Sequence, residues 1–157
     1  DTNFRSNIWS ATDAKNAILD VIKYIDILSP SYPEEVNKIF ELDTPLEMIK
    51  FGLSKGCKLV VVKCGEDGAY IGDSNKIIYS KAITPRGLLD TTGAGDSFLG
   101  GFLYSYIKNM NIEDNMRYAI SSAGLKISGR GGIQSQPTKD EVEKYINLVN
   151  VKEITYK

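Results

Sequence analysis

A short glycine-rich segment carries the residues with the clearest chemistry. Gly93, Ala94 and Gly95 stand directly before an acidic residue, Asp96, in the run DTTGAGD. Small residues let an anion approach the main chain, and N–H groups at the start of a helix lack intrahelical acceptors. A carboxylate beside a bound phosphate needs a role of its own, and accepting a proton from a substrate hydroxyl is one. The alternative is that Asp96 only caps a helix after a flexible turn.

The amino-acid composition limits which other catalytic mechanisms and metal sites the chain can form. The chain contains no histidine, which excludes Ser-His-Asp and Cys-His catalysis and histidine-containing zinc sites within it. Acid and base chemistry must come from carboxylates, Lys, Tyr or Cys. The two cysteines, Cys57 and Cys64, bracket a valine-rich run that reads as one strand, and an extended segment holds them too far apart to bridge. We expect both to be reduced and structural.

Composition describes an ordinary globular domain. The 157 residues are 42% hydrophobic and 25% charged, which is typical of a single soluble domain. A net charge of −1 without a basic run argues against nucleic acid and anionic membranes as partners. No apolar stretch approaches the roughly 20 residues of a spanning helix, and no signal peptide is recognised at the start. These features predict a cytoplasmic protein.

The elements that position these residues alternate between strands and helices, which favours an α/β fold with a largely parallel sheet. Apolar spacing predicts a helix over residues 14–24. Two further helices flank a loop at residues 129–136, one before it over residues 113–128 and one after it. The remaining predictions are the end of a strand at 1–5, strands at 27–28 and 58–63, a turn at 65–68, a hairpin from 69–72 and 76–80, a strand at 88–90, a helix to about 108, and a tail at 151–156.

Helix-start signals fix several boundaries. Thr44 to Glu47 forms a capping box with Pro at the first helical position, and Gly56 closes that helix. Thr138 to Glu141 forms a second capping box. Ser31 is expected to cap a helix over residues 35–40.

Residues 90–102, DTTGAGDSFLGGF, resemble the second signature of the PfkB family of sugar kinases. The resemblance implies a ribokinase-like three-layer αβα sandwich with a mostly parallel central sheet. It also implies ATP and Mg²⁺ as cofactors and a small-molecule sugar or sugar acid as substrate. In this family the amides of Gly93, Ala94 and Gly95 form an anion hole for the transferred phosphoryl group, and Asp96 is the catalytic base that contacts the substrate.

Other segments resemble the family in the same order. Residues 60–69 are similar to the strand and Gly-x-x-Gly turn beside the nucleotide phosphates, although an ordinary hairpin turn would look alike. Residues 27–34 resemble the Asn-x-x-Glu segment tied to magnesium and phosphate, with a serine where Asn is usual, and residues 130–138 resemble the loop that closes near adenine. The resemblance implies nucleotide contacts at Ser31, Lys63, Gly65, Gly68, Ser121 and Ser122, and an indirect metal contact at Glu34.

The first nine residues give a clue to the class of substrate. Residues 1–9, DTNFRSNIW, resemble a stretch of 2-keto-3-deoxygluconate kinases and fructokinases, which implies substrate contacts by Asn3 and Arg5. A guanidinium holds a carboxylate or phosphate in two-pronged fashion. The alternative is a surface Arg5 that pairs with Asp1 or a helix terminus.

Together with Ser31, this stretch favours 2-keto-3-deoxygluconate as the substrate. A fructokinase, another PfkB sugar or nucleoside kinase, and a non-catalytic nucleotide-binding or scaffold relative remain as alternatives.

The resemblance extends over almost all of residues 1–157 but only over the C-terminal half of the family's usual length. The N-terminal half, with the substrate lid, is absent from this sequence. We therefore expect the fragment alone to be inactive, and a homodimer is an option for the full-length protein.

Overall fold

The computed structural model describes residues 1–155, which form two compact units. The sheet unit comprises residues 1–65, 69–78 and 153–155, and the helical unit comprises residues 66–68 and 79–152. Within the described residues, no helix combines the length and the apolar character needed to cross a bilayer.

Five strands form one sheet in the order in which they occur along the chain. β1 and β2 pair in parallel, with Ile27 opposite Leu59, whereas β2 and β3 pair antiparallel, with Lys63 opposite Ala69. The connection between β2 and β3 is too short for a crossover, so the expected largely parallel sheet is mixed at this point. The strands are β1 (Ile27–Leu28), β2 (Leu59–Lys63), β3 (Ala69–Gly72), β4 (Ile77–Ser80) and β5 (Lys152–Ile154).

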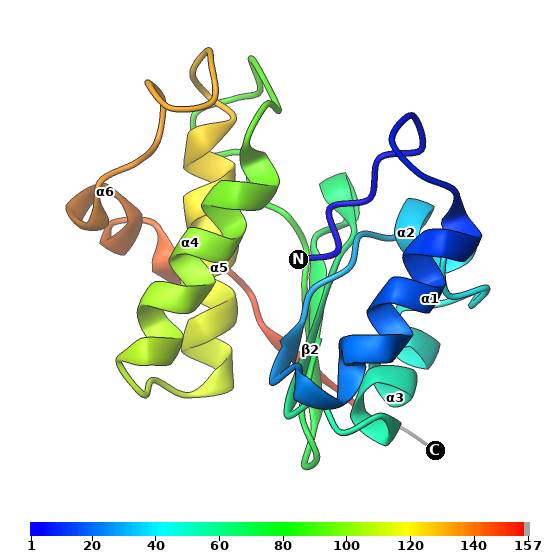
Figure 1. Ribbon diagram of the computed structural model, residues 1–157. Helices are drawn as coiled ribbons and strands as arrows, with labels where there is room; N and C mark the ends of the chain where they lie inside the picture. Colours follow the sequence, from blue (N-terminus) through cyan, green and yellow to red (C-terminus); the bar gives the residue numbers. More distant parts are fainter. Residues whose placement is uncertain (156–157) are drawn as a thin grey trace. The chain divides into compact units, whose positions relative to one another are not determined.

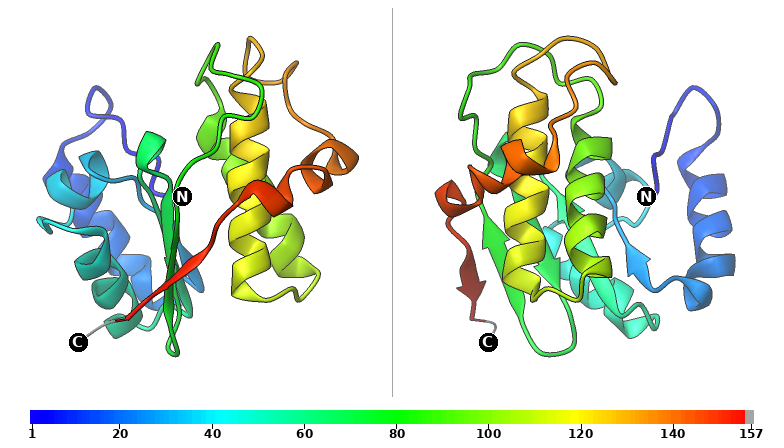
Figure 2. Two further views of the ribbon diagram at one scale, coloured as in Figure 1. Left: turned by 180° about the vertical axis from the view of Figure 1, so that it is seen from behind. Right: turned by 90° about the vertical axis from the view of Figure 1, so that its left-hand side faces the viewer.

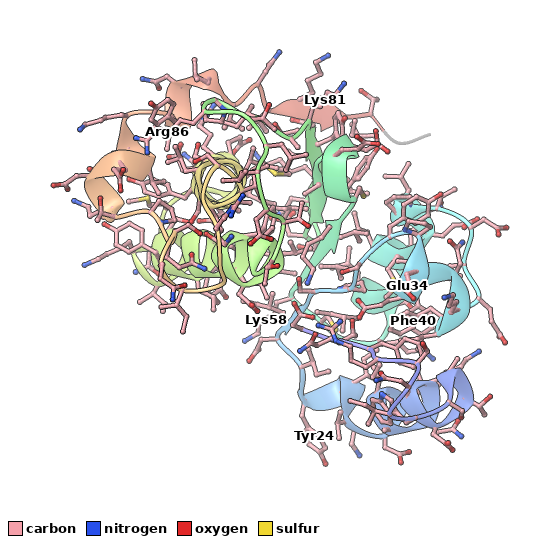
Figure 3. All side chains as sticks on the ribbon, turned by 90° about the horizontal axis from the view of Figure 1, so that it is seen from above. Tyr24, Glu34, Phe40, Lys58, Lys81 and Arg86 are labelled. Carbon is pink, nitrogen blue, oxygen red and sulfur yellow. The ribbon has the colours of Figure 1, made fainter. Side chains whose placement is uncertain are left out.

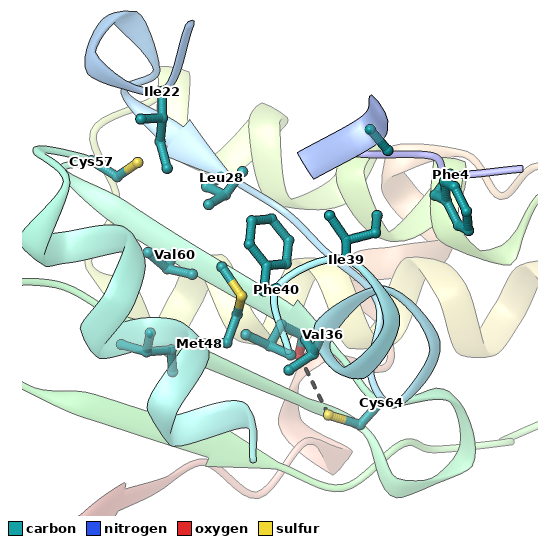
Figure 4. Close-up of a cluster of buried hydrophobic side chains, with 13 residues drawn as sticks. Phe4, Ile22, Leu28, Val36, Ile39, Phe40, Met48, Cys57, Val60 and Cys64 are labelled. Atoms are coloured by element: carbon teal, nitrogen blue, oxygen red, sulfur yellow. Dashed lines mark hydrogen bonds between the residues drawn. The ribbon is translucent and has the colours of Figure 1, made fainter. Parts of the chain in front are cut away.

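Helices of the sheet unit lie against β2 (Figure 1). They are α1 (Ala11–Val21), continued by the 3₁₀ turn η1 (Ile22–Tyr24), α2 (Glu34–Lys38) and α3 (Pro45–Ser54). Figure 4 shows the core between them, where Phe40 and Met48 pack close to Val60 of β2. Cys57 and Cys64 are buried thiols, as expected, and the Cys64 thiol lies 3.7 Å from the Val62 carbonyl. Burial of this apolar set is the main driving force for the unit.

Two antiparallel helices dominate the helical unit (Figure 2). α4 (Ala94–Ile107) and α5 (Ile112–Lys126) lie side by side, and the loops before α4 and after α5 leave the same end of the pair. The shorter elements are η2 (Gly65–Asp67), which spans the unit boundary, α6 (Lys139–Glu143) and the 3₁₀ turn η3 (Ile146–Leu148). A second, smaller core joins Tyr118 and Leu125 of α5 to Val142 of α6.

Both predicted capping boxes are confirmed. The Thr44 hydroxyl accepts from the Glu47 N–H at 3.2 Å, and the Glu47 carboxylate accepts from the Thr44 N–H at 3.0 Å. The pair Thr138 and Glu141 repeats this arrangement at α6. The predicted Ser31 cap is wrong, because α2 begins after Pro33 and Ser31 instead forms a β-bridge with Lys63.

Two predicted strands are absent from the described residues. Residues 1–5 follow an irregular path, with Asn3 at a positive φ of 40°. Residues 88–90 are also irregular, and their amides at Leu89 and Asp90 both donate to the Ile127 carbonyl. Conversely, β5 lies within the predicted tail, of which Tyr156 is outside the described residues.

Candidate active site

The turn before α4 has the backbone of an anion site. Gly93 is the N-cap, with φ 77° and ψ 12°, and a Cβ atom there would stand 3.2 Å from the Gly132 carbonyl oxygen. The Ala94 N–H donates to the Thr91 carbonyl at 3.0 Å. The next two amides, of Gly95 and Asp96, belong to the first helical turn, where a helix supplies no acceptor. Of the amides expected to form the anion hole, that of Ala94 is thus already bonded within the chain. The N–H groups of Gly95 and Asp96 are available to an anion, together with the positive end of the helix dipole.

Asp96 lies in the first turn of α4 with an exposed side chain. It borders an open pocket of about 280 Å³ that is lined by residues of α4, α5, α6 and the segment before α6. Ser97, Tyr118 and Ser122 also line this pocket. An exposed carboxylate next to unfilled amides can accept a proton from a hydroxyl held there.

Asp90 stabilises the turn before α4 through hydrogen bonds. Its carboxylate accepts the Thr92 N–H at 2.9 Å and the Gly131 N–H at 2.8 Å. Hydrogen bonding to the Thr92 side chain, followed by these two backbone bonds, lowers the pKa of Asp90 from 3.8 to about 2, with a smaller contribution from the charge of Lys126. Asp90 therefore links the turn before α4 to the loop after α5.

The two serines expected to face the nucleotide are buried in α5. The Ser122 hydroxyl lies 3.0 Å from the Ser97 hydroxyl and lines the same pocket as Asp96. The Ser121 hydroxyl is fully buried and has no hydrogen-bond partner among the described residues. Ser122 is therefore grouped with Asp96, whereas Ser121 points into the interior.

The predicted phosphate-side turn begins at the end of β2. The Lys63 ammonium forms an ion pair with the Asp1 carboxylate in the sheet unit. Gly65 and Gly68 have positive φ values of 57° and 94°. A Cβ atom at Gly68 would collide with the Ser80 carbonyl, whereas one at Gly65 would meet open space. Gly68 is thus required by packing, and Gly65 leaves its backbone accessible.

The segment with Asn3 and Arg5 is tied down by its neighbours. The Asn3 N–H donates to the Asp1 carboxylate at 2.8 Å, and the exposed Arg5 guanidinium contacts the Phe4 carbonyl at 3.4 Å. Because Asp1 pairs with Lys63, the alternative pairing of Arg5 with Asp1 is not found in residues 1–155. The guanidinium remains exposed for a ligand.

Sequence reasoning missed Glu35. This carboxylate is only 4% exposed and accepts from the Thr2 hydroxyl at 2.5 Å and from the N–H groups of Phe4 and Ser31, both at 2.6 Å. Helical spacing could have revealed it, because the apolar Ile39, the buried C-cap of α2, follows Glu35 by four positions and lies on the same face. Glu34, the residue singled out instead, is exposed and pairs with Lys38 at 2.9 Å (Figure 3).

ATP with Mg²⁺ fits these groups. Residues 1–155 contain no cluster of three or more residues of the metal-ligating types. A nucleotide-bound Mg²⁺ keeps water ligands and needs only one or two carboxylates besides the phosphates. Asp96 is an exposed carboxylate beside the anion site, and the glycine turn leaves room for a phosphate.

Comparisons with known proteins agree on one family. Residues 1–139 match the model of the "pfkB family carbohydrate kinase". An ATP-dependent 6-phosphofructokinase of Thermoanaerobacterium thermosaccharolyticum is 31% identical over 149 residues, which cover 94% of this chain and 46% of that protein. A 2-dehydro-3-deoxygluconokinase of Haemophilus influenzae is 32% identical over 140 residues, which cover 85% and 43%.

Among solved structures, an E. coli protein described as a ribokinase II, in complex with ATP and Mg²⁺, superposes with a TM-score of 0.81 at 27% identity. The match covers 93% of this chain and 47% of that one. The ribokinase-like α/β fold is thereby confirmed, and the chain spans about half the length of the relatives it matches.

Proposed function

Because the chain belongs to the pfkB family of carbohydrate kinases, we propose that the protein transfers a phosphoryl group from ATP to a sugar hydroxyl. The observation that carries this proposal is the position of Asp96, which is exposed and lies three residues after the left-handed Gly93, in the helical turn that has the unfilled amides. The proposal concerns the protein that contains this chain, since relatives are about twice as long.

The residues act by positioning and electrostatics, which supply most of the catalysis in phosphoryl transfer. The amides of Gly95 and Asp96, at the positive end of α4, hold the transferred phosphoryl group. The Asp96 carboxylate accepts the proton of the attacking hydroxyl as the new P–O bond forms and the bond between the γ-phosphorus and the β,γ-bridging oxygen breaks, with ADP as the leaving group. Bound Mg²⁺ would offset the negative charge of the phosphates.

For the substrate we favour 2-keto-3-deoxygluconate. The support is the exposed Arg5 guanidinium, which suits a sugar-acid carboxylate, and the name of the H. influenzae relative. A sugar phosphate is the second candidate, because the same guanidinium suits a phosphate and another relative is a 6-phosphofructokinase.

A coupled ADP-release assay on the full-length protein tests the proposal. The panel holds 2-keto-3-deoxygluconate, fructose 6-phosphate, fructose, ribose and adenosine, each with ATP and Mg²⁺. Activity on the keto-deoxy acid alone supports both reaction and substrate, and activity on another sugar keeps the reaction and changes the substrate. Lack of activity on every member, with ATP bound, would favour a non-catalytic scaffold.

Arg5→Ala separates the substrate classes. Removing a two-pronged, charge-assisted contact should lower kcat/KM for an acidic or phosphorylated sugar by about tenfold or more, and for a neutral sugar much less. Arg5→Lys, which keeps the charge but not the planar fork, should recover part of the loss. Equal losses on charged and neutral sugars would rule out the guanidinium clamp.

A further inference from the structure

Lys126, at the end of α5, is an internal cation. Its side chain is fully buried, which is rare for lysine unless the ammonium has a partner. An ammonium carries three N–H donors. Within the described residues, the acceptor found for them is the main-chain carbonyl of Asp90, at 3.4 Å. Hydrogen bonding inside the protein therefore accounts for only part of the cost of burying this charge.

The ammonium lies directly behind the turn before α4. The Cε atom of Lys126 is 3.6 Å from the place where a Cβ atom of Gly93 would stand. That separation is ordinary van der Waals contact, so the Lys126 side chain packs against the turn, and glycine is required at position 93 by its φ of 77°. The amides of Gly95 and Asp96 come directly after this turn, at the start of α4.

The Asp90 carboxylate carries the opposite charge, and its attraction to Lys126 contributes to the lowering of its pKa. Both oxygens of Asp90 are held by amides, one by Thr92 and one by Gly131. Lys126 reaches the carbonyl of Asp90 rather than its carboxylate. The carboxylate thus fixes the two loops to each other. The ammonium offsets the negative charge of that carboxylate, which would otherwise repel a phosphate at the turn.

We propose that Lys126 is a positioning residue of the phosphate site, which holds the Asp90–Gly93 turn by its hydrogen bond and strengthens phosphate binding through the field of its charge. Because the side chain has no exposed surface, it acts through the turn and does not touch the nucleotide. This inference rests on the proposed function, since it assumes that nucleotide phosphates bind at the start of α4.

The test compares ATP with adenosine in the full-length protein by calorimetry. Lys126→Met keeps the length and apolar character of the side chain and removes the charge. ATP affinity should fall by about tenfold, the order expected for loss of one unit charge several ångströms away at intermediate dielectric. Adenosine, which lacks phosphates, should bind as to the wild type.

Two controls separate charge from structure. Lys126→Arg should retain most of the ATP affinity, because the charge remains. Lys108→Met, which removes an exposed lysine at the opposite end of α4, should leave the affinity unchanged. Equal weakening of ATP and adenosine by Lys126→Met, or no weakening of either, would overturn the inference.

A measurement on the wild type does not depend on the folding of any variant. In protein labelled with ¹⁵N-lysine, the ammonium signal of Lys126 should be protected from exchange, and ATP but not adenosine should shift it. A signal that ATP leaves unmoved, while calorimetry shows ATP bound, overturns the role of Lys126 alone. A wild type that binds no ATP overturns the proposed function, and this inference with it.

Discussion

At the scale of single residues, Gly93 and Asp96 have opposite effects on anion binding at the same turn. Gly93 provides a left-handed cap that brings the main chain close to an anion, and Asp96 brings a negative charge to the same place. A carboxylate that only capped the helix would bond to a nearby N–H, but the N-cap position belongs to Gly93, and α4 shows no side-chain cap. The placement therefore favours a chemical role for Asp96.

Asp96→Asn tests that role. The amide keeps the size of the side chain but cannot accept the hydroxyl proton, so kcat should fall by about 100-fold or more. The dissociation constant of ATP should change little, because the backbone amides remain. Asp140→Asn, at an exposed position in α6, controls for the loss of one negative charge. Near-normal turnover would remove Asp96 from the role of base.

Gly93→Ala tests the backbone of the turn. A methyl group at φ 77°, 3.2 Å from the Gly132 carbonyl, should lower the free energy of unfolding by about 1–3 kcal/mol and weaken ATP binding. The control is Gly95→Ala, since no atom lies within 4 Å of a Cβ there. Urea denaturation should rank the control well above Gly93→Ala, and equal stabilities would contradict the left-handed turn.

At the scale of elements, the contact between α4 and α5 depends on one of two adjacent glycines. A Cβ atom at Gly101 would lie 2.5 Å from the Tyr118 carbonyl, whereas one at Gly100 meets nothing within 4 Å. The helices are thus close-packed at Gly101, and Gly100 is exposed. This close approach lets Ser97 of α4 reach Ser122 of α5 beside the candidate site.

Substituting each glycine by alanine should shift stability in opposite directions. Gly101→Ala should lower the free energy of unfolding by about 1–3 kcal/mol, because the helices must separate. Gly100→Ala should raise it by about 0.5–1 kcal/mol, because alanine is the better helix former. Thermal denaturation of the pair measures both. A Gly101→Ala variant as stable as Gly100→Ala would contradict the packing of the two helices.

Elements with local signals could be predicted from the sequence. The boxes at Thr44 and Thr138 involve residues three positions apart, so local pattern suffices. The strand predicted at 88–90 failed because Leu88 and Leu89 suggested burial, yet they are 65% and 56% exposed. No neighbouring strand pairs with them, and pairing is a property of the fold rather than of the segment.

The same limit applies to the site. The glycine turn and Asp96 are contiguous, so their spacing could be read directly. Glu35 and Lys126 were missed because their importance lies in burial, and contacts with residues about 30 positions away in sequence create it. From the sequence alone a charged side chain is expected to be exposed, and only the tertiary structure shows that it is buried.

At the scale of the whole molecule, the candidate residues are divided between the two units. The sheet unit carries Arg5, Ser31 and Lys63, and the helical unit carries Gly93 and Asp96. Each group is already organised within its own unit, by Glu35 in the first and by Asp90 in the second. The geometry of each group therefore depends on the stability of its own unit.

Asp90 makes the stability of the helical unit depend on pH. Its folded-state pKa of about 2 lies below the ordinary value of 3.8, so the folded protein prefers the ionised form. The stabilisation is complete above an ordinary carboxyl pKa and is lost as pH falls from about 4 to about 2. Asp90→Asn removes it, so wild type and variant should differ in urea midpoint at pH 6 and converge towards pH 2. A difference that persists unchanged at pH 2 would show that Asp90 acts through shape rather than charge, and that its bonds to Thr92 and Gly131 do not require the ionised carboxylate.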